Sequence, residues 1–381
     1  MKKKFFCFIG ILVMVLLAGC SAGNTAAGPQ KTGNAEKAES TAIAETAKQA
    51  EASEKVETAE KTETAEKTET AGKTETIENA ENAKPSDDVT IRIGGLTGPT
   101  SIGLIKVMED SANGGSLCNY DFTIAGSADE LTPDLIKGKL DIAAVPANLA
   151  SVLYNNTQGK VKLLAINTLG VLYVAEKGDS IRSAADLKGR TIYATGKGST
   201  PEYTLRYILS ENGIDPDRDV TIEFKSEPTE VVALLKSSDQ AAAMLPQPYV
   251  TAAQAQVEGL RIALDLTEEW DRLGKGSRAI TGVLAVRADW AQEHPEALEA
   301  FLTEYQASVD YVNENVDEAA ELVEKFGLFK AAVAKKAIPY CNIVFIAGED
   351  MKAPMDGYLK VLFDANPKSV GGKLPDADFY Y

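Results

Sequence analysis

Short apolar runs alternate with amphipathic stretches from Val89 to the C-terminus, and this alternation constrains the fold more than any other feature of the chain. The apolar runs predict strands at 89–96, 120–125, 140–145, 161–175 (one strand or two), 191–194, 220–224 and 241–245. The amphipathic stretches predict helices from Ile102 onward and over 128–137, 147–154, 201–211 and 227–236. This alternation predicts an α/β fold with mostly parallel sheets flanked by helices. The segment is too long for one such sheet of ordinary size, so we expect two lobes.

An internal repeat supports two similar lobes. The run LIKGKLDIAAV at 135–145 aligns with LLKSSDQAAAM at 234–244, and a proline follows each closely (Pro146 and Pro246). Both runs have the pattern of a helix end, a tight turn and a strand of small residues. Upstream of each run, a predicted strand leads through a Gly-x-Thr into a predicted helix, at 98–100 and at 198–200. The two matches occur in the same order along the chain, which favours a duplicated unit over coincidence.

The N-terminus has the pattern of an export signal. Residues 2–4 are lysines, residues 5–17 are mainly apolar, and the stretch ends in Leu17-Ala18-Gly19-Cys20. The apolar part is shorter than the roughly 20 residues of a spanning helix, which favours a secretory signal. A Cys after Leu-Ala-Gly resembles the bacterial lipobox, whose Cys is acylated once the signal is removed. We therefore expect residues 1–19 to be a lipoprotein signal peptide and Cys20 to carry the lipid, the alternative being an ordinary signal peptide with an incidental Cys.

Residues 20–87 are rich in Ala, Glu, Lys and Thr and contain almost no large apolar residue. Such a segment buries too little surface to offset its ordering entropy, so we expect a disordered tether. Loss of residues 1–19, with their three lysines, changes the formal charge from −17 to −20. An acidic protein repels nucleic acid and anionic lipid headgroups. We therefore expect no nucleic-acid partner, and membrane contact through the lipid anchor only.

Few residues are candidates for catalysis or metal binding. His294 is the only His, so a His-based catalytic triad is excluded, and its charged surroundings predict a surface position. Trp270 either stacks on a ligand or packs beneath a loop. The acidic residues around it have the pattern of an exposed turn; they are Glu268, Glu269 and Asp271.

Two cysteines remain in the predicted folded part, Cys118 and Cys341. They either form one long-range disulfide or remain two buried thiols. Because the sequence has no Cys/His spacing typical of a metal site, we expect no metal and no cofactor.

Four predicted loops follow strands and lead directly into helices, at 96–101, 146–148, 197–200 and 246–249. In open α/β sheets, ligands bind beyond the carboxyl ends of the strands. Helix starts present backbone N–H groups and partial positive charge, which favour a polar or anionic ligand. The alternative for each Ser, Thr or Asn in these loops is helix capping alone. A phosphate-binding P-loop is excluded at 94–98, because no Lys-Ser/Thr follows its glycines.

Several stretches, taken in order, resemble the substrate-binding lipoproteins of ABC importers. The similarity is to the nitrate/sulfonate/taurine-binding family and its thiamine-pyrimidine-binding relatives, which have the type 2 periplasmic binding protein fold. It is carried by LIKGKLDIAAVP at 135–146, SAADLKGRTIY at 183–193 with the GKGST that follows closely, and GVLAVRADW at 282–290 with HPEA at 294–297. The resemblance covers about residues 89–320. Departures leave the ligand class open, because these loops offer only Lys197 as a cation and the Cys-rich motif of the fungal thiamine-pyrimidine synthases is absent.

The resemblance implies two similar lobes joined by two crossover strands, near 172–177 and near 283–287. Lobe 1 would comprise 88–176 and 285–381, and lobe 2 would comprise 177–284. The implied ligand-binding residues are Thr97, Thr100, Ser101, Pro146, Asn148, Ser199, Thr200, Gln247, Tyr249 and Thr281.

The implied function is that of a lipid-anchored, extracytoplasmic and monomeric solute-binding protein rather than an enzyme. It would capture a small polar or anionic organic molecule by hinge closure and deliver it to an ABC permease and its ATPase. Alternatives are a ligand-binding sensory module for a membrane receptor and a two-lobed enzyme.

Overall fold

The computed structural model describes residues 89–237, 241–273 and 276–381, all of which belong to one compact unit of the chain. The signal peptide expected at 1–19, the lipidated Cys20 and the tether expected at 20–87 lie outside the described residues. Within the described part, no helix is both long and apolar enough to cross a membrane.

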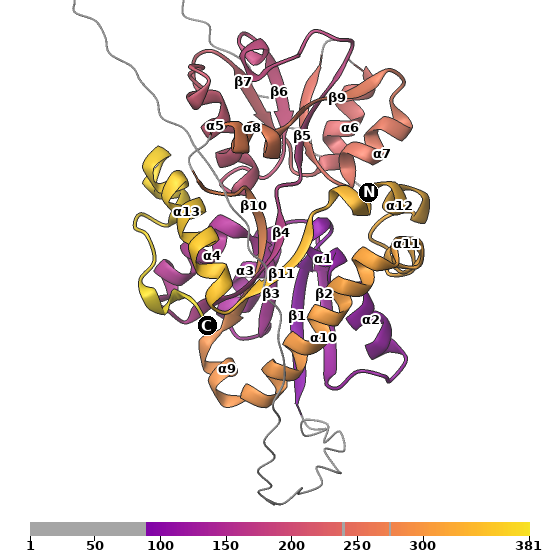
Figure 1. Ribbon diagram of the computed structural model, residues 1–381, viewed down its shortest axis with the longest axis vertical. Helices are drawn as coiled ribbons and strands as arrows, with labels where there is room; N and C mark the ends of the chain where they lie inside the picture. Colours follow the sequence, from indigo (N-terminus) through magenta and orange to yellow (C-terminus); the bar gives the residue numbers. More distant parts are fainter. Residues whose placement is uncertain (1–88, 238–240, 274–275) are drawn as a thin grey trace, which may run out of the picture. The chain divides into compact units, whose positions relative to one another are not determined.

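Lobe 1 is built around a six-stranded mixed sheet in the order β11-β4-β10-β3-β1-β2 (Figure 1). Its strands are β1 (Thr90–Leu96), β2 (Asn119–Ala125), β3 (Ile142–Pro146), β4 (Val161–Leu169), β10 (Ile280–Arg287) and β11 (Ile343–Ala347). β1 runs parallel to both β2 and β3, whereas β10 is antiparallel to β3 and β4, and β11 is antiparallel to β4. The parallel part is formed by the N-terminal strands, and the antiparallel part by strands that arrive from elsewhere in the chain.

Lobe 2 is built around a five-stranded mixed sheet in the order β7-β6-β8-β5-β9. Its strands are β5 (Leu172–Lys177), β6 (Thr191–Ala194), β7 (Thr221–Phe224), β8 (Ala242–Pro246) and β9 (Leu260–Asp265). β6 is parallel to β7 and β8, and β5 is antiparallel to β8 and β9. The two α/β lobes predicted from the sequence are therefore confirmed, but both sheets are mixed rather than mostly parallel.

The two sheets share one topology. The order β2-β1-β3-β10-β4 in lobe 1 corresponds to β7-β6-β8-β5-β9 in lobe 2. The repeated runs at 135–145 and 234–244 accordingly lead into β3 and β8, which hold equivalent places in the two sheets. The strand beside β3, however, is β10, which follows lobe 2 in the chain, and the strand beside β8 is β5, which follows lobe 1.

This exchange of strands moves the two crossovers relative to the sequence expectation. The segments expected to cross, 172–177 and 283–287, lie wholly within one sheet each, as β5 and as part of β10. The chain passes from β4 to β5 at Gly170 and Val171, and it returns to lobe 1 between α8 and β10. A Cβ atom at Gly170 would lie 2.2 Å from Thr267 Oγ1, so the first crossing packs directly against the second.

Helices cover both faces of each sheet. In lobe 1 they are α1 (Pro99–Ile102), α2 (Ile105–Ala112), α3 (Ala128–Ile136), α4 (Ala147–Thr157), α9 (Ala288–Glu293), α10 (Pro295–Glu314), α11 (Val316–Lys325), α12 (Ala331–Ala337) and α13 (Glu349–Ala365). In lobe 2 they are α5 (Thr200–Glu211), α6 (Pro228–Ser237), α7 (Tyr249–Gln256) and α8 (Leu266–Arg272). Short 3₁₀ turns cover Ala184–Leu187, Ile338–Tyr340, Pro367–Val370 and Ala377–Phe379.

Three buried apolar clusters hold these layers together. One belongs to lobe 1 and includes residues of α2, α10, α11 and α12, and one belongs to lobe 2 and includes residues of α6 and α7. The third contains residues of both lobes, with α4 and α13 from lobe 1 and α5 and α8 from lobe 2. The two lobes therefore share one continuous apolar core on the side where α13 lies (Figure 1).

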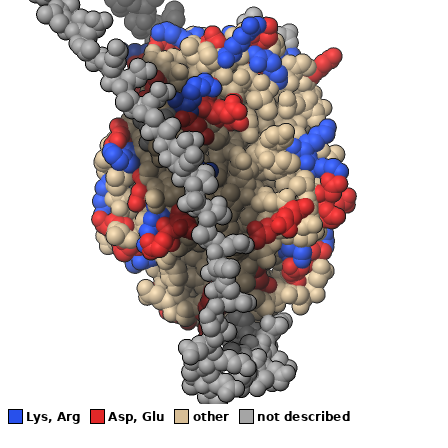
Figure 2. Space-filling model, in the orientation of Figure 1, with Lys and Arg blue, Asp and Glu red and all other residues tan. Residues whose placement is uncertain are grey.

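The C-terminal tail, which sequence patterns do not place, packs on lobe 1. Tyr380 forms a parallel bridge with Leu163, and the Tyr381 N–H donates to the Leu163 carbonyl at 2.9 Å. Cys118 and Cys341 are both buried, unbridged thiols, which decides between the two alternatives for this pair. The face shown in Figure 2 carries acidic and basic side chains interspersed rather than a continuous basic stripe, so that face offers no track for a nucleic-acid backbone.

Candidate functional site

A cavity of about 320 Å³ lies where the two lobes meet. Its volume falls within the range of about 300–1,000 Å³ that is usual for small-molecule sites. It is lined by six loops or strand ends, 96–100, 126–129, 146–149, 195–201, 225–228 and 246–249, together with Leu172 and Thr281. These segments lie at the carboxyl ends of β1, β2 and β3 in lobe 1 and of β6, β7 and β8 in lobe 2.

Six helices, α1 and α3 to α7, begin at this cavity. Helix starts present backbone N–H groups and partial positive charge, which favour a polar or anionic ligand. Four of the six loops are predicted from the sequence, and those after β2 and β7 are not. The missed loops, at 126–129 and 225–228, carry the same signal, since each joins a predicted strand end to a predicted helix start.

Six of the ten predicted ligand-binding residues line the cavity: Thr97, Thr100, Pro146, Ser199, Tyr249 and Thr281. Additional hydroxyls that sequence reasoning missed come from Ser127, Thr195 and Ser226. A wall with this many hydroxyl groups suits a ligand that has several hydrogen-bonding atoms.

Thr100 has the most informative side chain of this set. It is only 5% exposed, and its Oγ1 atom has no hydrogen-bond partner within the described residues. A buried hydroxyl without a partner costs about 1–3 kcal/mol, so such groups are uncommon unless something outside the chain binds them. Gly282 of β10 makes room for this side chain, because a Cβ atom there would lie 2.4 Å from Thr100 Cγ2.

The other four predicted residues are buried behind the cavity wall: Ser101, Asn148, Thr200 and Gln247. Gln247 bonds to Val171 at the first crossing and to Thr251 in lobe 2. Its backbone N–H donates to the Val171 carbonyl, and its Oε1 accepts from the Thr251 hydroxyl. Ser101 is fully buried, and a Cβ atom at Gly95 would lie 2.3 Å from its Oγ. The structure therefore brings these four residues near the site without giving them a place in its lining.

Asn148 and Thr200 bind each other across the lobe junction. The Thr200 hydroxyl donates to Asn148 Oδ1 at 3.2 Å, and the Asn148 N–H donates to Thr200 Oγ1 at 3.4 Å. Asn148 Nδ2 also donates to the carbonyl of Ser369, at 2.9 Å, and the Tyr358 hydroxyl donates to Thr200 Oγ1 at 3.2 Å. These contacts join α4, α5, α13 and the C-terminal region beneath the cavity floor.

The loop before α5 depends on two glycines. Gly196 and Gly198 have φ values of 76° and 75°, a left-handed conformation that other residues adopt with strain. The Gly198 N–H donates to Glu202 at 2.7 Å, and the Ser199 hydroxyl donates to the Gly196 carbonyl at 2.8 Å. These bonds occupy part of the hydrogen-bonding capacity of the loop, so the helix start is partly capped from within.

Three charged side chains line the cavity. Lys197 and Lys225 come from lobe 2, and Asp129 comes from lobe 1. Lys225 binds Glu223 at 3.1 Å and lies 5.5 Å from the Tyr193 ring centre, whereas Lys197 has no ion-pair partner in the part of the chain that the structure describes. The lobe 2 wall is therefore the more positive of the two, and Lys225 is a second cation that the sequence analysis missed.

Tyr249 closes one edge of the cavity. Its hydroxyl donates to the Thr97 carbonyl at 3.1 Å across the lobes, and its ring meets Phe329 edge-on at 4.9 Å. Burial, together with the nearby carboxylate of Glu227, raises the pKa of Tyr249 to about 12, so its hydroxyl stays protonated and able to donate at neutral pH. Next to the cavity lies a groove of about 490 Å³, which shares Thr97, Gly126, Pro228 and Tyr249 with it.

The residues considered for catalysis lie away from the cavity. Trp270 packs between the rings of Tyr207 and Tyr358, and its Nε1–H donates to Ser277 at 3.0 Å, so it is a core residue. His294 is partly exposed beside Trp290. No group of three or more metal-binding side chains occurs within 89–237, 241–273 and 276–381.

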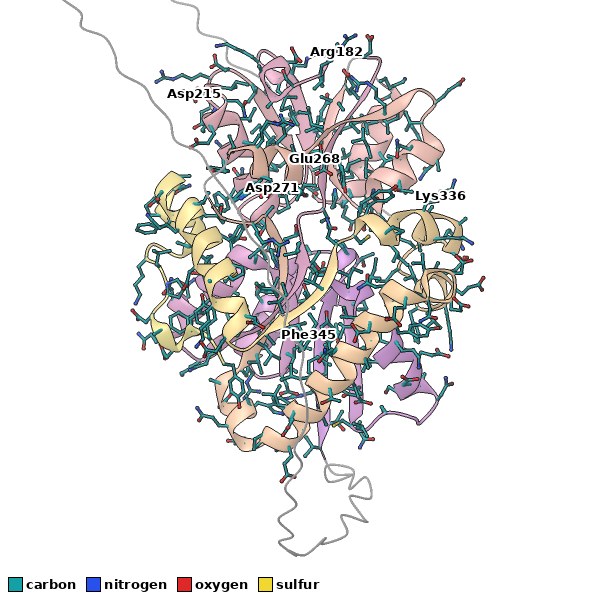
Figure 3. The ribbon with its side chains drawn as sticks, viewed as in Figure 1. Arg182, Asp215, Glu268, Asp271, Lys336 and Phe345 are labelled. Carbon is teal, nitrogen blue, oxygen red and sulfur yellow. The ribbon has the colours of Figure 1, made fainter. Side chains whose placement is uncertain are left out.

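The acidic residues near Trp270 lie on α8. Glu268 and Asp271 are exposed on this helix (Figure 3), and Glu269 is buried and pairs with Arg272 at 2.8 Å. This patch is therefore a helix with one internal ion pair, rather than the turn expected from the sequence.

Comparison with known proteins gives matches over most of the described residues. The profile of the NMT1-like family matches residues 121–326, more than half of the chain. A Brucella abortus protein named as a binding protein is 25% identical over 174 residues, which are 46% of this chain and 52% of that protein. The nitrate/nitrite binding protein NrtA of Nostoc is 27% identical over 161 residues, which are 42% of this chain and 34% of that protein. The chain thus spans about half the length, or less, of these curated relatives.

Among solved structures, an ABC transporter from Parabacteroides distasonis matches with a TM-score of 0.65 at 25% identity, covering 77% of this chain and 99% of that chain. The fold class expected from the sequence and the resemblance to nitrate-binding proteins are both confirmed by these comparisons.

Proposed function

The chain belongs to the NMT1-like family, and on this basis we propose that it is a solute-binding protein. It captures a small polar or anionic organic molecule between its lobes and delivers that molecule to the permease and ATPase of an ABC importer. Both lobes line the same cavity, so a ligand contacts both of them only when the lobes are closed. Ligand binding therefore shifts the protein toward its closed form. The protein acts as a monomer, and binding rather than catalysis is its role.

The observation that carries this proposal is the buried hydroxyl of Thr100. It lines a cavity at which six helices begin, and it has no hydrogen-bond partner within the described residues. A ligand atom that accepts or donates one hydrogen bond would remove the cost of this burial. The two lysines of lobe 2 favour a ligand with negative charge, and the hydroxyls around them favour one with oxygen atoms.

The relatives support delivery to an importer. One is named as a nitrate/nitrite binding protein, and a solved neighbour is described as an ABC transporter. The lipobox-like run that ends at Cys20 supports an acylated N-terminus. Two or three acyl chains would hold the protein stably at the outer face of the membrane, whereas one would not.

The test of the function is a thermal-shift screen of the full chain against nitrate, bicarbonate, small sulfonates, thiamine pyrimidines, riboflavin, aromatic acids and amino acids. A ligand that binds only the folded state raises the melting temperature. At a ligand concentration of one hundred times its Kd, it adds about 2.7 kcal/mol to the free energy of unfolding. We expect a dose-dependent shift with one class and no chemical conversion of that compound.

The matched control is Thr100→Val, which keeps the shape of the side chain and removes its hydroxyl. We expect this variant to fold as the parent does and to lose most of the shift. A shift of equal size in Thr100→Val would show that the ligand binds elsewhere. The anchor is tested separately in cells by incorporation of an azide-tagged palmitate, which Cys20→Ser should abolish; unchanged incorporation in this variant would contradict the anchor.

A further inference from the structure

The two flanks of the lobe junction are built differently. On one flank α13 of lobe 1 lies beside α5 and α8 of lobe 2, and on the other flank α12 of lobe 1 lies beside α7 of lobe 2 (Figure 1). Both flanks bring helices into contact. They differ in what those helices bury.

The α13 flank contains large aromatic side chains in a shared core. Tyr358 of α13 is fully buried, and Trp270 of α8 is 2% exposed. Their ring centres lie 5.6 Å apart, and the ring of Tyr207 on α5 lies 4.6 Å from that of Trp270. All three belong to the apolar cluster that runs through both lobes. This flank is therefore packed like the interior of a single domain.

Buried hydrogen bonds reinforce the same flank. The Tyr358 hydroxyl donates to Thr200, which in turn donates to Asn148, and Asn148 donates to the carbonyl of Ser369. Each of these four residues is at most 1% exposed. Parting the lobes here would leave several buried polar groups without partners.

The opposite flank is held by less. The apolar residues of α12 and α7 belong to two separate clusters, one in each lobe, so no continuous core crosses this edge. The specific contacts are two hydrogen bonds, from the Tyr249 hydroxyl to the Thr97 carbonyl at 3.1 Å and from the Tyr173 hydroxyl to the Tyr340 carbonyl at 3.5 Å, and one ring contact between Tyr249 and Phe329. The adjoining groove of about 490 Å³ is formed by α6 and α7 on one side and by 328–333 on the other.

The lysines of that groove are already paired. Lys236 donates to Gln256 at 2.8 Å within lobe 2, and Lys330 binds Glu324 at 2.8 Å within lobe 1. Neither pair spans the lobes, so neither resists their separation. The groove can therefore widen without breaking any charge pair of its own.

We infer that the α13 contact is a fixed pivot and that the lobes part at the Tyr249 edge, so that ligand reaches the cavity through the adjoining groove. Opening at α13 would expose aromatic side chains that bury about 150–250 Å² each and would break the hydrogen-bond chain from Tyr358 to Ser369. Opening at the Tyr249 edge breaks two hydrogen bonds and one ring contact. This inference goes beyond closure in general, because it assigns which side of the junction moves.

The experiment measures distances between spin labels across each flank. The full chain with Cys7→Ser and Cys20→Ser retains only the buried thiols of Cys118 and Cys341, which do not label. One pair, Ala255→Cys with Lys336→Cys, spans the Tyr249 edge, and the other, Asp271→Cys with Ala353→Cys, spans the α13 flank. All four positions are exposed, and Figure 3 marks Lys336 at the right edge of the molecule and Asp271 near its middle.

Each pair is compared with and without Tyr249→Phe, which removes the bond to Thr97 and keeps the ring. We expect the 255–336 distances to shift outward and broaden in Tyr249→Phe, and the 271–353 distances to stay unchanged. Tyr381→Phe is the matched control, because it removes a tyrosine-to-carbonyl bond that lies within lobe 1, to Ala291, and it should change neither pair.

Two outcomes would overturn the pivot. One is a 271–353 distribution that broadens as much as the 255–336 distribution. The other is that both distance distributions are as narrow in Tyr249→Phe as in the parent protein. Because no ligand is added, failure here leaves the proposed solute binding untouched, and failure of the thermal-shift screen leaves this result interpretable.

Discussion

The hydroxyl of Thr200 donates to the side-chain oxygen of Asn148 at 3.2 Å, and the bond crosses from lobe 2 to lobe 1. Thr200 is the first residue of α5 and Asn148 is the second residue of α4, and the sequence pattern predicts both as ligand contacts. In the structure they form hydrogen bonds with each other instead, behind the cavity wall. The polar residues at the helix starts are thus divided between those that face the cavity and those that join the lobes.

This division predicts that two threonines contribute differently to the free energy of unfolding. Thr100→Val should leave the free energy of unfolding within about 1 kcal/mol of the parent, because the lost hydroxyl has no partner in the chain. Thr200→Val should lower it by about 1–3 kcal/mol, because Tyr358 and Asn148 each lose a partner. Urea unfolding followed by circular dichroism measures both. Equal losses in the two variants would contradict the division.

A buried carboxylate at the far end of β3 should be critical for stability. Asp141 is fully buried and accepts from the Arg92 N–H at 3.0 Å, from Arg92 Nε at 2.8 Å and from Arg287 at 3.5 Å. Asp141→Asn should lower the free energy of unfolding by about 1–3 kcal/mol, since it removes charge-assisted hydrogen bonds from Arg92 and Arg287, whose side chains remain 37% and 19% exposed.

The matched control is Asp289→Asn, which also removes a carboxylate that pairs with Arg287. Asp289 is 62% exposed, so the loss should be about 0–1 kcal/mol. Chemical denaturation of both variants gives the comparison, and similar losses would mean that burial is not what makes Asp141 important.

Glu176 should make lobe 2 sensitive to acid. Burial pushes its pKa upward, but hydrogen bonds from Ser180 and the Ile181 N–H and the charge of Arg261 outweigh burial and hold the pKa below its ordinary value. A depressed folded-state pKa adds stability above the unfolded-state pKa, and this stability is lost as pH falls through the folded-state value.

The free energy of unfolding should therefore fall between about pH 5 and pH 3, and the fall should be shallower in Glu176→Gln. Unfolding midpoints measured across this range test the slope, which is independent of any constant loss caused by the substitution. Parallel pH profiles for the two proteins would rule Glu176 out as the source.

Gly282 should be required for the shape of the cavity. A Cβ atom at this position would lie 2.4 Å from Thr100 Cγ2 and 2.7 Å from Asn167 Oδ1. Gly282→Ala should therefore displace Thr100, with a loss of about 1–3 kcal/mol in stability and a weaker ligand-induced thermal shift. Gly115→Ala is the control, since its nearest new contact would be an ordinary 3.7 Å. Retention of the full ligand shift in Gly282→Ala would show that Thr100 is not needed in its present place.

The two cavity lysines predict the sign of the ligand charge. Lys197→Gln and Lys225→Gln each remove one positive charge from the lobe 2 wall. For an anionic ligand, each should weaken binding about tenfold, corresponding to about 1.4 kcal/mol, and raising the salt concentration should weaken binding further. Titration calorimetry measures both effects. Binding that is insensitive to both substitutions and to salt would indicate a neutral ligand.

Local patterns predicted most elements of the fold but not all of their partners. The strands up to Pro246 lie within two residues of the predicted ranges, because short apolar runs between turns have few alternatives. The direction in which β5 and β10 pair has no local signal, since each joins a sheet whose other strands lie far away in the chain. The tail is a similar case, because Tyr380 pairs with Leu163 over a separation that no local pattern encodes.

The candidate site was predicted at the level of loops better than at the level of side chains. Strand-to-helix loops meet at the junction as expected, including two that the sequence analysis did not select. Which side chain faces the cavity depends on packing from other elements. Asn148 is turned away from the cavity by contacts to Thr200 and Ser369, residues more than 50 positions distant, and Tyr358 of the unplaced C-terminal region completes the network.

The position of β10 between β3 and β4 has a consequence for how the chain acquires its structure. β3 and β4 are adjacent in sequence, yet their only link within the sheet is a strand that lies beyond the whole of lobe 2. During synthesis, the sheet of lobe 1 therefore lacks its strand between β3 and β4 until residues 280–287 have been synthesised. Contacts between such distant segments slow folding. A chain of this design stays incompletely folded until late, which is the state that the export predicted from residues 1–20 would require.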